Sequence, residues 1–151
     1  MSIRITNIFS ADYKEEGISE RDGATGRTLD LSGEHLGVRI EEGDAGGTSS
    51  YHHYHTAEEE HVLILKGAGT LHLGTERIDL SEGDHIWFPA GEEVPHHLEN
   101  TSTEPFKYLV FGERKQDDVV FYPNGSVMLV KSSKGFQTYT YEERPIEGSR
   151  E

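Results

Sequence analysis

Hydrophobic residues along this chain occur in short runs that are separated by turn residues. Residues 36–41 alternate apolar and polar side chains, the period of two that is typical of a half-buried strand. Residues 60–66 are apolar almost throughout and stop at Gly67, and residues 70–73 and 76–80 flank a Gly-Thr pair that predicts a hairpin. No long segment shows helical periodicity. The pattern therefore predicts an all-β chain.

The remaining apolar runs extend this prediction over the whole sequence. Further strands are predicted at residues 3–9, 51–55, 85–88, 95–100, 106–111, 119–122, 126–131 and 136–141. Many short strands at regular spacing favour a β-sandwich or barrel. Because no repeat or linker divides the chain, we expect one domain over residues 1–151, with a polar, looped lead-in at 1–35 and a strand extension at 112–151.

The charge balance narrows the classes of partner. With 28 acidic and 14 basic residues, the formal net charge is −14. Such an acidic protein is a poor match for the phosphates of nucleic acid and for anionic membrane surfaces, so we expect neither as a partner. The acidity is typical either of a protein adapted to high salt or of an ordinary acidic cytosolic protein.

The absence of cysteine excludes disulfides and any zinc site that is built on sulfur. The N-terminus has no apolar segment of the kind that marks a secretory signal, and the apolar runs are too short to span a bilayer. We therefore expect a cytoplasmic protein.

The candidate chemistry lies in residues 47–67. His53 and His55 are two residues apart, so on a strand their side chains point to the same face. Glu60 begins the next predicted strand, where its carboxylate can join the two imidazoles. Two imidazoles and a carboxylate that meet at one point are typical ligands of a divalent transition metal.

The spacing of this stretch resembles the first motif of the cupin superfamily at every spaced position: Gly47-x5-His53-x-His55-x4-Glu60-x6-Gly67. A later stretch, residues 83–100, resembles the second cupin motif: Gly83-x5-Pro89-x-Gly91 followed by His96-x3-Asn100. It departs at one point, because four residues separate Gly91 from His96 where the usual pattern has two. The fourth ligand is therefore His96 or its neighbour His97, and the spacing to Asn100 favours His96.

The resemblance implies a double-stranded β-helix, the jelly-roll barrel of cupins, often as a homodimer. It also implies one divalent first-row metal (Fe, Mn, Ni, Cu, Co or Zn) held by His53, His55, Glu60 and His96. The central motifs cover residues 47–100, and the segment 121–124 resembles tails on some little-characterised members.

Other polar residues near the motifs have simpler interpretations. Glu58 and Glu59 are predicted to be solvated, with Glu59 as the substitute ligand if the strand register differs. Strand parity predicts that His52, His61 and His97 point away from the ligands. Tyr51 shares the face of His53, which places its phenol inside the barrel. We expect His35 and His85 to be exposed and His72 to be either lumenal or solvated. We expect Asn100 to be a turn residue or a residue that supports a ligand, and not a ligand itself.

Two functions are compatible with this site. The first is a metal-dependent enzyme of the isomerase, lyase or dioxygenase type that acts on a small oxygen-rich molecule. The second is a non-catalytic cupin that binds or senses a small-molecule ligand. The sequence contains no recognisable catalytic triad, paired carboxylates or phosphate loop beside the proposed metal cluster, so catalytic residues stay unassigned.

Overall fold

The alternating segments form three antiparallel sheets in the computed structural model, which describes residues 3–16 and 25–144. The first sheet has the order β1 (Lys14–Glu16), β2 (Gly26–Asp30), β3 (Leu36–Gly43), β10 (Phe106–Glu113), β5 (Glu60–Lys66) and β8 (His85–Phe88). The second has the order β13 (Gly135–Thr140), β12 (Val127–Ser132), β11 (Val119–Tyr122) and β4 (Tyr54–His55). The third has the order β7 (Glu76–Leu80), β6 (Gly69–Leu73) and β9 (His96–Glu99).

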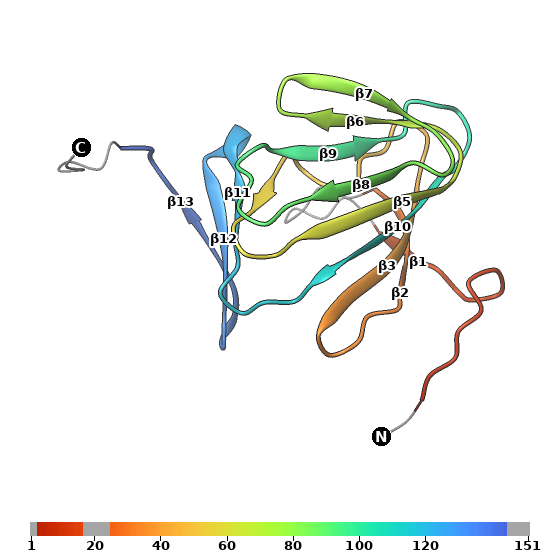
Figure 1. The fold of residues 1–151 in the computed structure, drawn as a ribbon, viewed down its shortest axis with the longest axis horizontal. Coiled ribbons are helices and arrows are strands. Elements are labelled where there is room, and N and C mark those ends of the chain that lie inside the picture. Colours follow the sequence, from red (N-terminus) through yellow and green to blue (C-terminus); the bar gives the residue numbers. More distant parts are fainter. Residues whose placement is uncertain (1–2, 17–24, 145–151) are drawn as a thin grey trace.

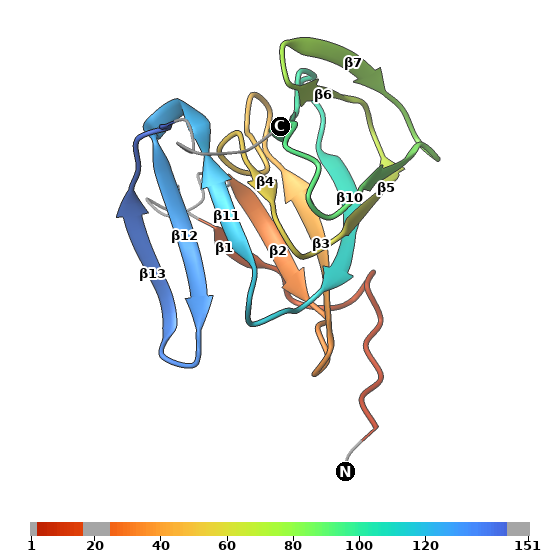
Figure 2. The same cartoon turned by 60° about the vertical axis from the view of Figure 1, so that its left-hand side comes forward.

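The sheets surround a common interior. Figure 1 shows the β7-β6-β9 sheet lying over β5 and β8, with β11, β12 and β13 along one side of the molecule. Figure 2 shows β4 beside β11, where the second sheet meets the barrel. One short 3₁₀ turn, η1 (Pro123–Gly125), is the helical element of the described residues. The prediction of an all-β jelly-roll barrel is confirmed.

Most strand predictions hold, and the exceptions are the N-terminal end of the chain and the strand predicted at 51–55, of which only β4 (Tyr54–His55) forms. The bounds of β5, β8 and β11 match those predicted. Residues 3–7 form no strand, and Ile3 and Ile5 are more than 90% exposed, so the prediction of a strand at 3–9 is wrong. The looped lead-in is also partly wrong, because β2 pairs along β3. The tail beyond residue 144 lies outside the described residues.

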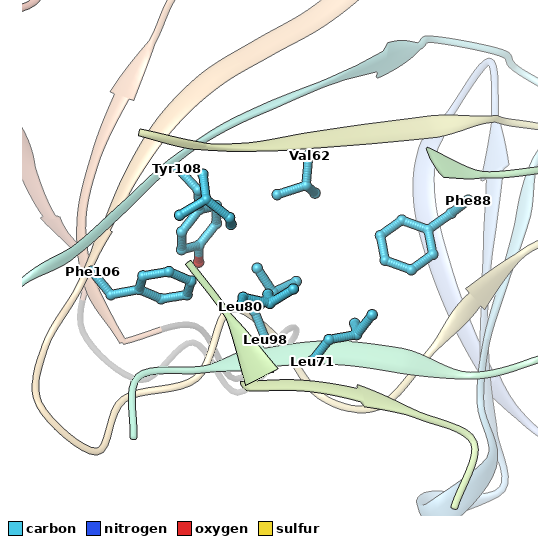
Figure 3. Close-up of a cluster of buried hydrophobic side chains, with 8 residues drawn as sticks. Val62, Leu71, Leu80, Phe88, Leu98, Phe106 and Tyr108 are labelled. Atoms are coloured by element: carbon cyan, nitrogen blue, oxygen red, sulfur yellow. The ribbon is translucent and has the colours of Figure 1, made fainter. Parts of the chain in front are cut away.

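An apolar cluster lies between the first and the third sheet. Figure 3 shows Val62 of β5 and Leu71 of β6 on opposite walls, both pointing into the cluster. The full set of buried members is Val62, Ile64, Leu71, Leu80, Phe88, Leu98, Phe106 and Tyr108. Val62 and Ile64 are both 1% exposed, as the alternation of β5 predicts.

Glycine is required where strands approach this cluster closely. A Cβ at Gly69, the first residue of β6, would lie 2.5 Å from Cε1 of Phe106 and 2.8 Å from the carbonyl oxygen of Glu99. Gly74 has a φ of 59° and begins the turn between β6 and β7, as the Gly-Thr pair predicts. These two positions let the β6–β7 hairpin close against the core.

No helix among residues 3–16 and 25–144 is long and apolar enough to cross a membrane.

An ionic network joins three neighbouring strands on the outer side of the first sheet. Glu42 of β3 forms ion pairs with Arg27 of β2 and with Lys107 of β10, the latter at 3.3 Å between Nζ and Oε2. Burial opposes ionisation of Glu42, but the hydrogen bonds and charges of the two cations lower its pKa below the usual value.

The core predicts a large cost for truncating Phe106, which is 1% exposed and packs against Tyr108 with ring centroids 5.1 Å apart. Phe106→Ala is expected to lower the free energy of unfolding by about 3–5 kcal/mol, measured by urea denaturation. Phe136→Ala is the matched control, because Phe136 is exposed on β13, and it should change stability by less than about 0.5 kcal/mol. Equal effects of the two variants would contradict this packing.

The Glu42 network predicts a specific loss of stability in acid. Because the pKa of Glu42 is lower in the folded state, its contribution is present above the unfolded pKa of about 4.3 and disappears as the pH falls. The unfolding free energy of the wild type should therefore fall more steeply between about pH 5 and pH 3 than that of Glu42→Gln. Glu76→Gln, at an exposed position of β7, should retain the wild-type slope. Parallel slopes for the wild type and Glu42→Gln would disprove the assignment.

Candidate metal centre

A backbone bridge brings the two motif segments together. His53 and His96 form an isolated antiparallel pair, in which each amide donates to the carbonyl oxygen of the other residue at 3.2 and 2.8 Å. Their imidazole ring centroids lie 4.9 Å apart. This pairing joins the segment before β4 to β9, although 43 residues separate the two positions in the sequence.

The four residues that the sequence selects converge inside the barrel. His53, His55 and Glu60 each offer a ligand atom, and these atoms lie within 4.8 Å of one another. Nε2 of His96 lies 3.9 Å from Oε1 of Glu60. The structure therefore holds a cluster that could bind a metal ion, formed at the junction of β4, β5 and β9.

Nδ1 of each histidine ring lies near a hydrogen-bond acceptor of the protein. Nδ1 of His53 lies 2.8 Å from the carbonyl oxygen of Tyr51, and Nδ1 of His55 lies 2.7 Å from Oδ2 of Asp118. His96 makes a longer contact of 3.5 Å between Nδ1 and the carbonyl oxygen of Val94. A ring that donates from Nδ1 keeps a lone pair on Nε2, which is the form in which histidine binds metals.

The strongest evidence for a bound metal is Nε2 of His96. This atom is buried and has no hydrogen-bond partner among the described residues. Buried polar atoms normally have a partner, because leaving one without a hydrogen bond costs about 1–3 kcal/mol. A cation between this nitrogen and the Glu60 carboxylate would satisfy both groups, so the residues fit a bound metal.

The protonation states of His53 and Glu60 suit metal binding as well. Burial, together with the neighbouring imidazoles of His96 and His55, lowers the pKa of His53 to about 3. Burial alone would favour a neutral Glu60, but contacts with the three histidines outweigh it and lower the pKa of Glu60 to about 2. Neutral imidazole and ionised carboxylate are the forms that coordinate metals.

Two carboxylates behind His55 are buried, and the sequence did not indicate either. Asp118 is 0% exposed and Glu58 is 7% exposed, so the expectation that Glu58 is solvated is wrong. Glu58 accepts a 2.7 Å hydrogen bond from the amide of Lys115 and forms an ion pair with Lys131. Both partners lie in the strand extension, and no motif spacing connects that extension to His55.

Residues near the motif that were expected to face away do so. Glu59 accepts a 3.0 Å hydrogen bond from Nε1 of Trp87 and does not replace Glu60 in the cluster. Nδ1 of His52 lies 2.9 Å from Nδ1 of His97, in a group of outward-facing histidines. Tyr51 is 47% exposed, so its predicted position inside the barrel is wrong.

The other histidines and Asn100 also have structural partners. His72 faces out and pairs with Glu99 at 2.6 Å, and His61 stacks on His85 and Phe111. His35 is exposed, as predicted. Asn100 is buried, and its side-chain amide donates to the carbonyl oxygens of Gly43 and Glu104, which confirms it as a turn residue.

Two cavities meet at the histidine cluster. The larger, about 410 Å³, is lined by the four motif residues and by polar groups that include Arg39 of β3 and, from the strand extension, Tyr122 and Lys131. The smaller, about 340 Å³, shares His55, Glu60 and His96 as wall residues and is otherwise mainly apolar; Leu71, Leu73, Ile86 and Val94 line it. A ligand in either space would lie against the cluster.

Comparison with known proteins agrees with this geometry. The model of the cupin domain family matches residues 39–112, which contain all four motif residues. A crystal structure of a putative sugar phosphate isomerase from Acidithiobacillus ferrooxidans is 30% identical, covers 77% of this chain and 76% of its own, and superposes with a TM-score of 0.73. The chain belongs to the cupin superfamily.

Two further relatives extend the comparison. A sugar phosphate isomerase of the cupin superfamily from Silicibacter pomeroyi superposes with a TM-score of 0.80 over 97% of this chain and 99% of its own, at 22% identity, which shows a shared fold. An uncharacterized protein from Aquifex aeolicus is 40% identical over 55 residues, or 36% of this chain. The chain spans 44% of the length of that relative.

Proposed function

We propose that His53, His55, Glu60 and His96 bind one divalent first-row transition metal, and that the protein is a metal-dependent isomerase of a small phosphorylated sugar. The main evidence for the metal is the buried Nε2 of His96, which has no hydrogen-bond partner within the described part of the chain and lies 3.9 Å from the Glu60 carboxylate. Three imidazoles and one carboxylate suit Fe, Mn, Ni, Cu, Co or Zn.

The substrate class follows from the cavity and from one relative. The larger cavity is lined by side chains that donate hydrogen bonds, among them Arg39, Arg114, Ser49 and Ser50. Such groups suit the hydroxyl and phosphate oxygens of a sugar phosphate. The Acidithiobacillus ferrooxidans protein, at 30% identity, is described as a putative sugar phosphate isomerase, and this supports the same class here.

Each part of the site has a role in this proposal. A bound divalent metal would act as a Lewis acid toward a carbonyl and the neighbouring hydroxyl, the groups that an aldose and a ketose exchange. The four side chains would hold the metal. The acceptors at Nδ1 of the three histidines would keep the imidazole rings oriented. The cationic residues of the larger cavity would hold the phosphate end away from the cluster.

Non-catalytic ligand binding is the second candidate, and the pairing of carboxylates around the larger cavity favours it. Glu41 pairs with Arg39 at 3.0 Å, Glu58 pairs with Lys131, and Glu59 accepts from Trp87. Oxygens that already accept hydrogen bonds or form ion pairs have fewer lone pairs available to a substrate proton. In this alternative, the metal would orient the ligand without turnover.

The metal proposal predicts different results for two adjacent carboxylates. Glu60→Gln keeps the shape of the side chain but removes the charge, so metal affinity should fall by at least the roughly 10–100-fold that loss of an outer partner costs. Glu59→Gln is the matched control and should bind metal as the wild type does. The measurement is titration of metal into metal-free protein, with elemental analysis of natively produced protein for stoichiometry.

Wild-type protein that takes up no stoichiometric divalent metal would contradict the proposal. Equal losses in Glu59→Gln and Glu60→Gln would also contradict the assignment of Glu60.

The isomerase proposal predicts turnover of a sugar phosphate. Metal-loaded protein should interconvert an aldose phosphate and its ketose phosphate, as followed by proton NMR. Chelation of the metal should abolish the interconversion, and added metal should restore it.

Sugar phosphates that bind the metal-loaded protein without turnover would overturn the isomerase and favour the binding function. The metal titration separates that outcome from failure of the metal site itself.

A further inference from the structure

Asp118 connects the strand extension to the cluster. It precedes β11, far outside the two motifs, yet its side chain is 0% exposed and lies against His55. We propose that Asp118 is a positioning residue that fixes the Nδ1–H tautomer of His55 and thereby presents its Nε2 to the metal. This inference rests on the metal site of the proposed function.

Both oxygens of Asp118 have defined partners. Oδ2 lies 2.7 Å from Nδ1 of His55. Oδ1 accepts hydrogen bonds from the amides of Ala57 at 2.9 Å and Glu58 at 3.2 Å. Since backbone amides only donate, they fix Oδ1 as an acceptor and leave Oδ2 to receive the His55 proton.

The backbone holds Asp118 in this place. β11 pairs with β4 through Val120 and His55, and the amide of Thr56 donates to the carbonyl oxygen of Val119 at 3.0 Å. The amide of Val119 in turn donates to Oγ1 of Thr56 at 2.9 Å. The carboxylate is thus attached to the same local structure as the ring that it orients.

A cation from β12 balances this buried charge. Nζ of Lys131 lies 3.5 Å from Oδ2 of Asp118 and forms an ion pair with Glu58. The ligand atoms of His55, Glu58 and Asp118 also lie close enough to hold a metal ion. Because the ammonium of Lys131 already supplies the positive charge there, we assign this cluster to positioning His55.

Asp118→Asn tests the assignment, because the amide is the same shape but has one acceptor. With Oδ1 retained by the amides of Ala57 and Glu58, the NH₂ group must face Nδ1 of His55. It would donate there and favour the opposite tautomer, with the proton on Nε2. The metal would then lose one lone pair.

The first measurement is nitrogen-15 NMR of the His55 ring in metal-free protein. Burial alone would lower the pKa of His55, but Asp118 and the nearby glutamates raise it above the ordinary imidazole value, so the pH is set well above this raised pKa. We expect the Nδ1–H tautomer in the wild type and the Nε2–H tautomer in Asp118→Asn. The matched control is Asp117→Asn, an exposed neighbour with the same change of charge, which should give the wild-type spectrum.

The second measurement is metal titration of the same proteins. Asp118→Asn should bind metal about 10–100-fold more weakly than the wild type, while Asp117→Asn should be unchanged. A role in stability alone would lower the melting temperature of Asp118→Asn without reversing the His55 tautomer.

A wild-type His55 with its proton on Nε2 overturns the proposal without need of any variant. So does a folded Asp118→Asn that keeps both the wild-type tautomer and the wild-type affinity. If the wild type binds no metal, the proposed function fails, and the tautomer spectra still decide whether Asp118 positions His55.

Discussion

The backbone pairing of His53 with His96 is the constraint on which the site depends. It closes the segment before β4 against β9 through two hydrogen bonds, and so brings one histidine of the first motif beside the histidine of the second. His53 precedes β4 of the second sheet and His96 lies in β9 of the third, so this pairing joins the two sheets at the site. The carboxylate of Glu60 approaches the two imidazoles from β5, which belongs to the first sheet.

The same strands carry the site at one end and the apolar core along the rest. In β5, Glu60 faces the cluster, and Val62 and Ile64 continue the same face into the core. In β9, His96 is followed on its face by the buried Leu98. Core packing therefore fixes the strand positions from which the polar side chains project, and a rigid support of this kind is what precise ligand geometry requires.

Local periodicity was sufficient to predict this part of the molecule. A period of two placed Glu60 with Val62 and Ile64, and it separated His96 from His97, because one face of each strand is buried. In the structure, His96 faces Glu60, whereas His97 bonds to His52 away from the cluster. Which metal binds, and whether these residues are its ligands, stays a prediction.

Contacts between residues far apart in the chain could not be predicted from the sequence. Asp118 contacts His55 across 63 positions, and an Asp-Asp pair before an apolar run carries no signal of burial. Glu58 was predicted to be solvated because it stands in a run of three glutamates. It is buried instead, where it forms an ion pair with Lys131 and accepts a hydrogen bond from the amide of Lys115. Similarly, β2 is polar and short, and its pairing with β3 determines its structure more than its own pattern does.

We propose that one metal ion lies among four named side chains. The most direct test is anomalous diffraction from metal-loaded crystals at the absorption edge of the bound element. The expected result is a single strong peak within coordination distance of Nε2 of His53, His55 and His96 and of the Glu60 carboxylate. A peak at the outer histidines His52 and His97, or no peak in protein that had been loaded with metal, would contradict it.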